Sequence, residues 1–452
     1  MNSPNHALVL GLGASGVAAA RLLCREGRSV VAIDRTPRNL LSASALALEG
    51  EGVELLTEST DLPSLDRFNL AVASPGLPVD SPWLNACRRA GLPVRSEVEL
   101  GWSRHPGRSI AVTGTNGKST IVKLIADWLS SLGYAAIPCG NYGLPVCEAV
   151  CPIDPHRLLV IEVSSFQLET CESFSPDVAI WLNLSPNHLD RHATLEAYRR
   201  AKARLFRSLR PHAHAIVHHH VLSDVRRVLP APVRLHAFGE AGPPLDFAFR
   251  DGVIEHRDQP LADFRKSSFE KAPIGVNAAS VAALALLMDL PVASLEQAAR
   301  SFQPLPHRYE VLGESNGLLF VNDSKASTFT ATAAALARAD RPVRLIAGGL
   351  LKEDDVDFIK EILAKTCAGV YVIGKCAETL NQAWRDVVRV RLSRSLDQAF
   401  DDAVGEARAG EIILLSPGCA SFDQFRGYQH RGETFINKVR TYSGETSHAE
   451  KT

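Results

Sequence analysis

The segment SIAVTGTNGKSTIVKLIADWLSSLG, residues 109–133, decides the expected fold. Its first five residues are the apolar run of a buried strand, and apolar residues recur at helical spacing from Lys118 onward. A loop containing Gly114 and Gly117 joins the two parts. A strand, a glycine loop and a helix in this order predict a phosphate-binding turn at the carboxyl edge of a parallel sheet.

The loop GTNGKST is similar to a shortened P-loop, because Val112 stands where the full pattern has its first glycine. Its amides and the helix dipole would receive phosphates, Lys118 would reach the terminal ones, and a hydroxyl would bind magnesium. The alternative is a glycine turn without a ligand. The residues expected to contact the phosphates and their magnesium ion are Gly114, Thr115, Asn116, Gly117, Lys118, Ser119 and Thr120.

Two later strands end in polar residues. One delivers Glu162, and the other ends near Asn183 before a loop that holds His188. Because parallel strands of such a sheet place their ends at one edge, we expect Lys118, Glu162 and His188 to converge. Taken singly, Glu162 also fits a surface or capping carboxylate, and His188 a histidine at a helix start.

The stretch ALVLGLGASG, residues 7–16, predicts a second glycine turn between a strand and a helix. Asp34 ends the next strand, about 20 positions after the glycines, as in dinucleotide-binding folds. A later strand ends in the turn at 74–76, at the edge where such sheets place ligands. The alternative is that the glycines serve only tight turning and helix packing.

Repeated strand and helix units after the proline-rich stretch near Phe302 predict a further open parallel sheet, smaller than the central one. We therefore expect an α/β protein of three domains. They are a Rossmann-like domain at 1–101, a central domain with a P-loop ATPase-like parallel sheet at 102–303, and a Rossmann-like C-terminal domain at 304–452.

Composition narrows the possible partners and the compartment. The 49 Lys and Arg against 50 Asp and Glu give a net charge of −1, which argues against nucleic-acid binding. The chain has no apolar stretch near the ~18 residues of a membrane-spanning helix, so we expect no membrane insertion. Nine scattered cysteines without a CxxC pair, and no export signal, favour a cytoplasmic protein, which we expect to be a monomer.

In this order, the chain's motifs resemble the Mur ligase family of peptidoglycan synthesis over nearly its whole length. The motifs are GTNGKST, GNYGLP, EVSSFQLE, NHLDRH with a downstream AK, LPHRYE, NDSKA and LSPGCASFDQF. SSFQLE is the most discriminating and is similar to the members that add D-glutamate to UDP-N-acetylmuramoyl-L-alanine. The resemblance implies ATP-dependent amide formation through an acyl phosphate, with release of ADP and phosphate.

The resemblance also implies roles in the central domain. Lys118 would hold the β- and γ-phosphates, and Ser119 or Thr120 with Glu162 would bind the nucleotide's Mg²⁺. His188 and Lys202 would support a second Mg²⁺, Lys202 as a carbamate; otherwise Lys202 is an exposed helix lysine. Further positions that match ATP contacts are Asn277, Arg308, Asp323 and Lys325.

For the substrates, the resemblance implies that the first domain binds UDP and that the third binds glutamate, whose carboxylate a lysine would pair with. The positions on the UDP side are Gly13, Ala14, Ser15, Asp34, Arg35 and Thr36, with Ser74 and Gly76 near the nucleotide sugar. The other substrate positions are Asn141 and Ser164 in the central domain, and Ser327, Lys352, Ser421 and Tyr428 for glutamate.

Departures from the family's pattern concentrate in the glutamate pocket. NDSKAST stands for NDSKATN, GGLLK for GGDGK, and Tyr428 for a phenylalanine; Ser280 replaces an asparagine thought to touch adenine. An L-glutamate-adding variant therefore stays open beside the D-glutamate enzyme. A folylpolyglutamate synthase-like ligase normally lacks the first glycine-turn domain, and an NAD-dependent dehydrogenase or a nonenzymatic nucleotide switch leaves other motifs unexplained.

Overall fold

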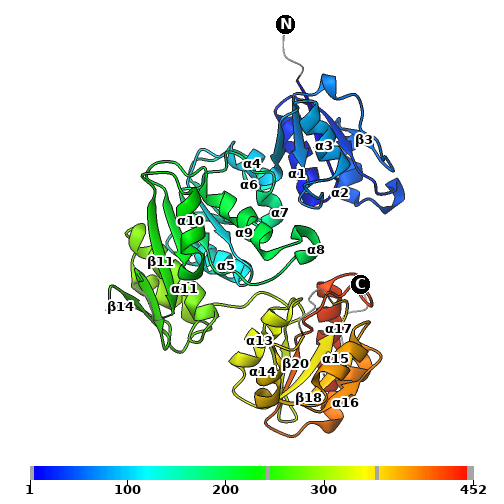
Figure 1. Cartoon of the computed structure of the whole chain (residues 1–452), viewed down its shortest axis with the longest axis vertical. Helices are drawn as coiled ribbons and strands as arrows, with labels where there is room; N and C mark the ends of the chain where they lie inside the picture. Colours follow the sequence, from blue (N-terminus) through cyan, green and yellow to red (C-terminus); the bar gives the residue numbers. More distant parts are fainter. Residues whose placement is uncertain (1–4, 241–244, 352–355, 445–452) are drawn as a thin grey trace. The chain divides into compact units, whose positions relative to one another are not determined.

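Three sheets of mostly parallel strands form the framework of the chain in the computed structural model (Figure 1). The structure describes residues 5–240, 245–351 and 356–444. The chain separates into two compact units, residues 1–302 and 303–452. The first unit holds two of the sheets and the second unit holds the third. The expected α/β class with three sheet-based domains is confirmed, while the domain borders at 101 and 303 stay predictions.

The first sheet is fully parallel, with strand order β3-β2-β1-β4-β5. Its strands are β1 (His6–Leu10), β2 (Ser29–Ile33), β3 (Glu54–Leu56), β4 (Leu70–Ala73) and β5 (Val94–Ser96). Its helices are α1 (Ala14–Arg25), α2 (Ala43–Leu46), α3 (Pro82–Arg89) and α4 (Glu97–Trp102). The chain leaves β1 toward β2 on one side and returns to β4 on the other, which makes the β1/β4 edge the topological switch point.

The central sheet has nine strands in the order β14-β13-β12-β11-β10-β9-β6-β8-β7. They are β6 (Ser109–Thr113), β7 (Ala135–Gly140), β8 (Arg157–Glu162), β9 (Val178–Trp181), β10 (His214–His218), β11 (Arg234–Glu240), β12 (Phe247–Arg250), β13 (Val253–His256) and β14 (Gln259–Asp263). The helices are α5 (Lys118–Ser131), α6 (Val146–Ala149), α7 (Ser165–Leu168), α8 (Leu189–His192), α9 (Leu195–Ala203), α10 (Leu222–Val228), α11 (Ile274–Leu287) and α12 (Val292–Arg300).

The third sheet has the order β15-β16-β20-β17-β18-β19. Its strands are β15 (Glu310–Ser315), β16 (Leu318–Asn322), β17 (Val343–Gly348), β18 (Cys367–Ile373), β19 (Val390–Leu392) and β20 (Ile412–Leu415). Its helices are α13 (Phe329–Arg338), α14 (Lys360–Thr366), α15 (Ala377–Trp384), α16 (Leu396–Glu406) and α17 (Tyr428–Tyr442). Helices α13 to α15 pack on one face, and α16 and α17 on the other.

Two departures from a purely parallel arrangement were not expected. Strands β12, β13 and β14 extend the central sheet as an antiparallel meander, and β15 pairs antiparallel with β16. Both sets lie at sheet edges, where short hairpin connections replace the helical crossovers that parallel pairing requires. They therefore leave the inner strands, which carry the site, parallel.

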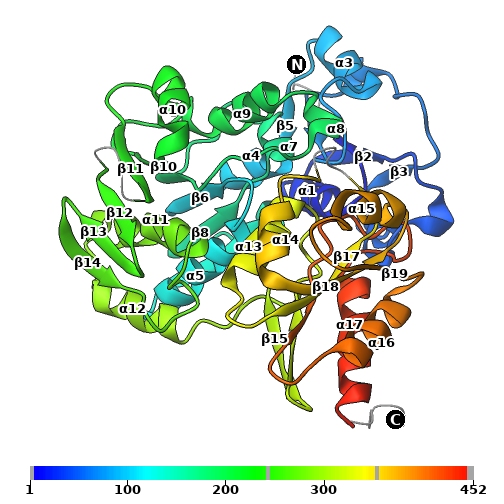
Figure 2. The ribbon, with the colours of Figure 1, turned by 60° about the horizontal axis from the view of Figure 1, so that its bottom comes forward.

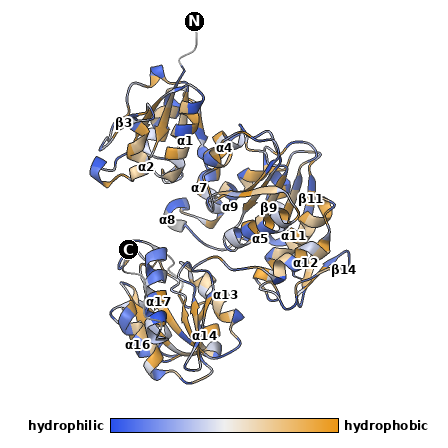
Figure 3. Cartoon of the chain, turned by 180° about the vertical axis from the view of Figure 1, so that it is seen from behind, coloured by the Kyte–Doolittle hydropathy of each residue, from blue (hydrophilic) through white to orange (hydrophobic). Residues whose placement is uncertain are grey.

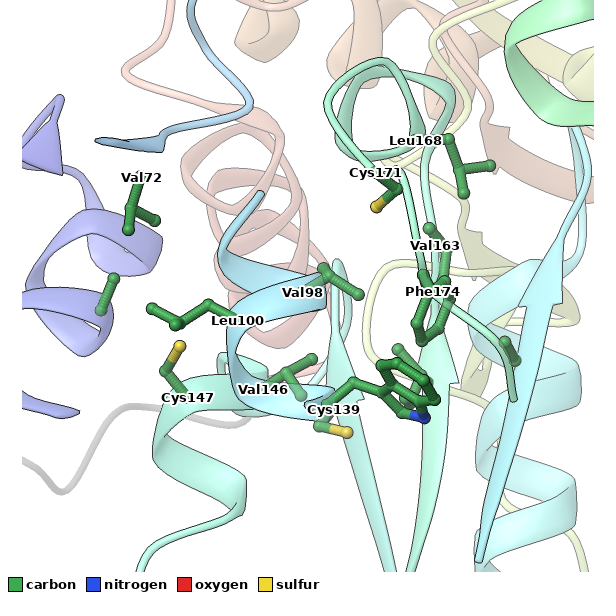
Figure 4. Close-up of a cluster of buried hydrophobic side chains, with 14 of the residues drawn as sticks. Val72, Val98, Leu100, Cys139, Val146, Cys147, Val163, Leu168, Cys171 and Phe174 are labelled. Atoms are coloured by element: carbon green, nitrogen blue, oxygen red, sulfur yellow. The ribbon is translucent and has the colours of Figure 1, made fainter. Parts of the chain in front are cut away.

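Alternate residues along the strands face opposite sides of each sheet, so each sheet has a hydrophobic core on both faces. Figure 3 shows hydrophobic residues concentrated in the strands. One core is shared by the first two sheets: Val72 of β4 lies in the same cluster as Leu100 of α4 and Val146 of α6 (Figure 4). This shared core joins the two sheets of the first unit.

No helix in the described ranges combines the length and the apolar character that crossing a membrane requires.

Candidate active site

Strands β9, β6 and β8 are neighbours in the central sheet and run parallel, so the loops that follow them leave from one edge. Figure 2 labels two of these strands, β6 and β8. The loop after β6 is the glycine loop 114–117, and α5 begins directly at Lys118. Glu162 is the last residue of β8, and Asn183 lies two residues beyond the end of β9. The structure thus brings these predicted segments together at the carboxyl edge of the sheet.

Glu162 forms the centre of this edge. It is buried, its Oε2 accepts a hydrogen bond from Ser119 Oγ at 2.5 Å, and its Oε1 accepts one from Asn141 Nδ2 at 2.6 Å. Three segments far apart in sequence therefore meet at one carboxylate. A carboxylate, a hydroxyl and an amide oxygen are the hard ligands that Mg²⁺ takes, so this residue set fits a magnesium site. Because Glu162 is buried, the alternative interpretation as a surface carboxylate is wrong.

Asn183 holds the glycine loop in shape. Its Oδ1 accepts the backbone N–H groups of Thr115 and Asn116 at 3.1 and 2.9 Å, and its Nδ2 donates to Asn277 Oδ1 at 3.1 Å. Gly117 has φ of +80°, and a Cβ there would lie 2.5 Å from Asn277 Nδ2. Only glycine fits this turn without strain. The loop conformation is therefore fixed by Asn183, from the segment after β9, and by Asn277 of α11.

Two lysines converge on one carbonyl. Lys118 Nζ donates to Gly114 O at 2.9 Å and to Thr115 O at 2.8 Å, and Lys202 Nζ donates to Gly114 O at 2.7 Å. Lys202 is 1% exposed, so the alternative of an exposed helix lysine is wrong. Burial, and then the charge of Lys118, lower the pKa of Lys202 well below its usual range, against the opposing charge of Glu162.

Tyr198 connects several of these groups, although the sequence gave it no role. Its hydroxyl donates to Thr115 Oγ1 at 3.3 Å, and its ring lies 4.5 Å from Lys202 Nζ. Burial raises the pKa of Tyr198 to about 12. Its position four residues before Lys202 on α9 puts both on one helix face, and that spacing is the signal that could have revealed it.

The remaining predicted site residues in the connections of the central sheet are His188, Thr120 and Ser164. His188 precedes α8 with φ of +57°, and its ring lies 4.8 Å from that of Phe166. Thr120 lies in the first turn of α5. Ser164 is the N-cap of α7: its Oγ accepts the N–H of Gln167, and Gln167 Oε1 accepts the N–H of Ser164. This capping box accounts for the serine and glutamine of SSFQLE as local structure.

The predicted UDP positions lie at the carboxyl edge of the first sheet. Gly13 is the N-cap of α1, and Ala14 and Ser15 begin that helix. The carboxylate of Asp34 accepts the N–H groups of Leu12 at 2.6 Å and of Thr36 at 2.8 Å. Burial alone would raise the pKa of Asp34, but these hydrogen bonds outweigh it, so the pKa is lowered.

Two more UDP positions lie close to this loop. A Cβ on Gly11 would approach Ser74 Cβ to 2.7 Å, so the turn of Ser74 and Gly76 packs directly on the first glycine loop. The guanidinium carbon of Arg35 lies 5.0 Å from the ring centre of Trp83 on α3. The two turns therefore form one edge between β1 and β4.

In the second unit, Asp323 directly follows β16. It accepts the N–H of Tyr309 at 3.0 Å and the hydroxyl of Ser416 at 2.8 Å. Burial raises the pKa of Asp323 to about 6, although these hydrogen bonds and the charge of Arg308 oppose the rise. Lys325 Nζ lies 3.8 Å from the ring centre of Tyr428, so two predicted positions contact each other.

Arg431 of α17 holds together the loops of the NDSKA and LSPGCASFDQF motifs. Its role was not predicted from the sequence. It is 1% exposed and donates to Ser324 O at 2.8 Å and to Cys419 O at 3.1 Å. Burial lowers the pKa of Arg431 to about 10. Ser421, two residues after Cys419, is buried, while Ser327 is half-buried.

Two predicted positions remain, Lys352 for glutamate and Ser280 near adenine. Lys352 lies outside the described residues. Ser280 is buried in α11, where its hydroxyl donates to Asn277 O at 2.6 Å. The serine is therefore bound to the helix backbone.

Comparison with family models covers most of the chain. Residues 5–96 match the Mur ligase MurD-like N-terminal domain, residues 112–279 the Mur ligase middle domain, and residues 307–419 the Mur ligase glutamate ligase domain. The resemblance that the motifs indicated is thereby confirmed.

Individual proteins give the same result. A UDP-N-acetylmuramoylalanine–D-glutamate ligase of Nitratidesulfovibrio vulgaris (strain DP4) is 38% identical over 440 residues, 96% of each chain. One of Acidobacterium capsulatum is 34% identical over 449 residues, 97% of this chain and 96% of that one. The MurF ligase from Thermotoga maritima in complex with ADP shares the fold, with a TM-score of 0.60 and 15% identity over 98% of this chain and 100% of that one. The chain belongs to the Mur ligase family of ATP-dependent ligases.

Proposed function

We propose that this chain adds D-glutamate to UDP-N-acetylmuramoyl-L-alanine, using ATP, as a step of peptidoglycan synthesis. The observation that carries the proposal is the pair of hydrogen bonds that Ser119 and Asn141 donate to the buried Glu162, at the sheet edge where Lys118 and Lys202 both donate to Gly114 O. The names of the relatives, which are 33–38% identical over nearly their whole length, support the same substrates. A match to a glutamate ligase domain at residues 307–419 supports glutamate as the incoming amino acid.

The reaction needs an activated carboxyl group, because a carboxylate is inert toward an amine. An oxygen of the substrate carboxylate attacks the γ-phosphorus, the bond to the β-phosphate oxygen breaks, and ADP leaves. The glutamate nitrogen then attacks the acyl carbon, loses a proton, and phosphate leaves with the attacking oxygen. Both transition states gather negative charge on oxygen, and Lys118 with the amides of the loop 114–117 is positioned to stabilise that charge.

Magnesium would be held by Ser119 or Thr120 with Glu162, and a second ion by His188 and Lys202. Bound Mg²⁺ neutralises phosphate charge and polarises the phosphoryl group. Asn141 holds Glu162 by a hydrogen bond, and so orients the carboxylate.

Carbamylation of Lys202 is part of the proposal. Its amine would lose a proton and bond to CO₂, which converts a cation into a carboxylate that binds metal. The buried, low-pKa amine beside Lys118 supports this, because only the neutral amine reacts with CO₂.

The other proposed ligand contacts are divided among the three domains. UDP would bind at Gly13, Ala14, Ser15 and the neighbouring turn of Ser74 and Gly76. Asn277, Arg308, Asp323 and Lys325 would contact ATP, and Ser327, Lys352, Ser421 and Tyr428 would contact glutamate. We propose a cytoplasmic monomer, because ATP and UDP-linked precursors are present in that compartment.

The test is phosphate release from ATP with UDP-N-acetylmuramoyl-L-alanine and, in parallel reactions, D-glutamate, L-glutamate or a diamino acid. We expect turnover with D-glutamate. Turnover only with L-glutamate would favour the stereochemical variant, and no phosphate release with any of the three would contradict the proposal.

A further inference from the structure

Arg191, in the NHLDRH segment, has contacts that none of the roles above uses. One guanidinium nitrogen, NH1, donates to Pro75 O at 2.8 Å, and the other, NH2, donates to Leu77 O at 2.7 Å. These two carbonyls flank Gly76, in the turn that follows β4 of the first sheet. Arg191 lies on α8, so a side chain from the central sheet's connections holds a turn of the first sheet.

The same guanidinium is fixed from the other side by α7 and the residue that follows it. NH2 also pairs with Glu169 Oε2 at 2.7 Å, and the guanidinium carbon lies 4.0 Å from the ring centre of Phe166. The side chains of Arg191 and Glu169 are 14% and 9% exposed. The pair is therefore largely removed from water, and the planar fork of arginine directs its other N–H groups at the two carbonyls.

This arrangement connects the turn to the His188 segment. Arg191 is three residues after His188, and the ring of Phe166 that contacts Arg191 also lies 4.8 Å from the ring of His188. On the other side, the turn at 74–77 packs on Gly11 of the first glycine loop. A continuous set of contacts thus runs from the first glycine loop, through the turn and Arg191, to the edge that carries His188.

We propose that Arg191 is a positioning residue. It holds the turn at residues 74–77 in the conformation that binds the sugar-phosphate part of the UDP-linked substrate, and it fixes the position of this turn relative to the His188 segment. The inference rests on the proposed function for the identity of that substrate. A lysine lacks the planar fork of arginine, so it would not reproduce the two directed hydrogen bonds, the pair with Glu169 and the stack on Phe166 together.

The experiment compares Arg191→Met and Arg191→Lys with Arg157→Met. Arg157 is a matched control, because its NH1 also donates to two backbone carbonyls of the first unit, Ala149 O and Cys151 O, away from the turn. For Arg191→Met we expect KM for UDP-N-acetylmuramoyl-L-alanine to rise about tenfold or more, with KM for ATP within about twofold of the wild type. Arg191→Lys should lie between the two, and Arg157→Met should change neither KM.

Unchanged KM for the UDP-linked substrate in Arg191→Met would overturn the inference, as would an equal rise in KM for ATP. If Arg191→Met does not fold, the KM values of Arg191→Lys decide by the same criteria. Calorimetric binding of UDP-N-acetylmuramoyl-L-alanine separates the two proposals. A wild type that binds this compound without turnover contradicts the proposed ligase reaction, while its loss of affinity in Arg191→Met still supports the inference.

Discussion

The two glycine loops of the first unit share the order of strand, loop and helix and differ in the side chains around them. Both follow a parallel strand and begin a helix, at α1 and α5. In the first, the carboxylate of Asp34 folds back to accept the N–H of Leu12. In the second, the loop leads into Lys118, and Ser119 donates to the carboxylate of Glu162. The same order of strand, loop and helix is therefore surrounded by different charged groups, and we expect these groups to determine which of the two loops performs chemistry.

Removal of the cation from the second loop should have the largest effect. We expect Lys118→Ala to lower kcat by about 100- to 1000-fold, because the proposed donor to the transferring phosphate would be lost. Phosphate release measures this, with Lys123→Ala as control, since Lys123 pairs with Asp127 on the surface of α5. Near-normal turnover of Lys118→Ala would contradict the proposed role of the second loop in phosphoryl transfer.

Lys202 tests whether the second loop needs an added carboxylate. We expect Lys202→Ala to lower kcat by up to about 100-fold, because the proposed support of a metal by the carbamylated lysine would be lost. Short carboxylic acids in the assay should restore part of the activity if a carbamate is the working form. Activity that no such acid restores, at concentrations that leave the Lys123→Ala control unaffected, would contradict the carbamate.

Asp34 tests the first loop. An asparagine side chain has one oxygen, which could accept one of the two N–H groups, while its NH₂ group would face the other N–H group. The first glycine loop should therefore be held less firmly. We expect Asp34→Asn to raise KM for the UDP-linked substrate about tenfold with kcat unchanged. Asp66→Asn, in an exposed position of the same part of the chain, is the control. A fall in kcat at unchanged KM would mean that the first loop also takes part in the chemistry.

Asp323 is, after Asp34 and Glu162, a third carboxylate at the carboxyl end of a strand, and its substitution should have the smallest effect. Its pKa of about 6 lies above the unfolded value of about 3.9, so the folded state binds more protons between these values. The stability that this group contributes is therefore present below pH 4 and is lost as pH rises through 6. Without ligands, Asp323→Asn should melt roughly 4 °C above the wild type at pH 7.5, and the difference should vanish near pH 4.

The control for this titration is Asp397→Asn, because Asp397 is an exposed carboxylate on α16. Its melting temperature should follow that of the wild type across the same pH range. A pH-independent difference between Asp323→Asn and the wild type would show that Asp323 does not titrate in this range.

The sequence predicted those parts of the site that one local stretch encodes. The strand, loop and helix of residues 109–133 carry their own signals, as do the glycine turn before α1 and the position of Glu162 at a strand end. Asn183, Arg191 and Arg431 could not be assigned in this way, because each acts on backbone that only tertiary packing brings near. Tyr198 has a local signal, its spacing of four residues from Lys202 on α9, but its contact with Thr115 depends on tertiary packing. The antiparallel strands β12 to β14 were missed because their short segments alternate weakly.

The most direct test of the central claim follows one oxygen atom. UDP-N-acetylmuramoyl-L-alanine labelled with ¹⁸O in its alanyl carboxylate is turned over with ATP and D-glutamate, and the released phosphate is analysed by mass spectrometry. A carboxylate that attacks the γ-phosphorus transfers its own oxygen, so each phosphate should carry one ¹⁸O atom. Phosphate without the label would contradict an acyl phosphate formed at the Lys118 and Glu162 edge.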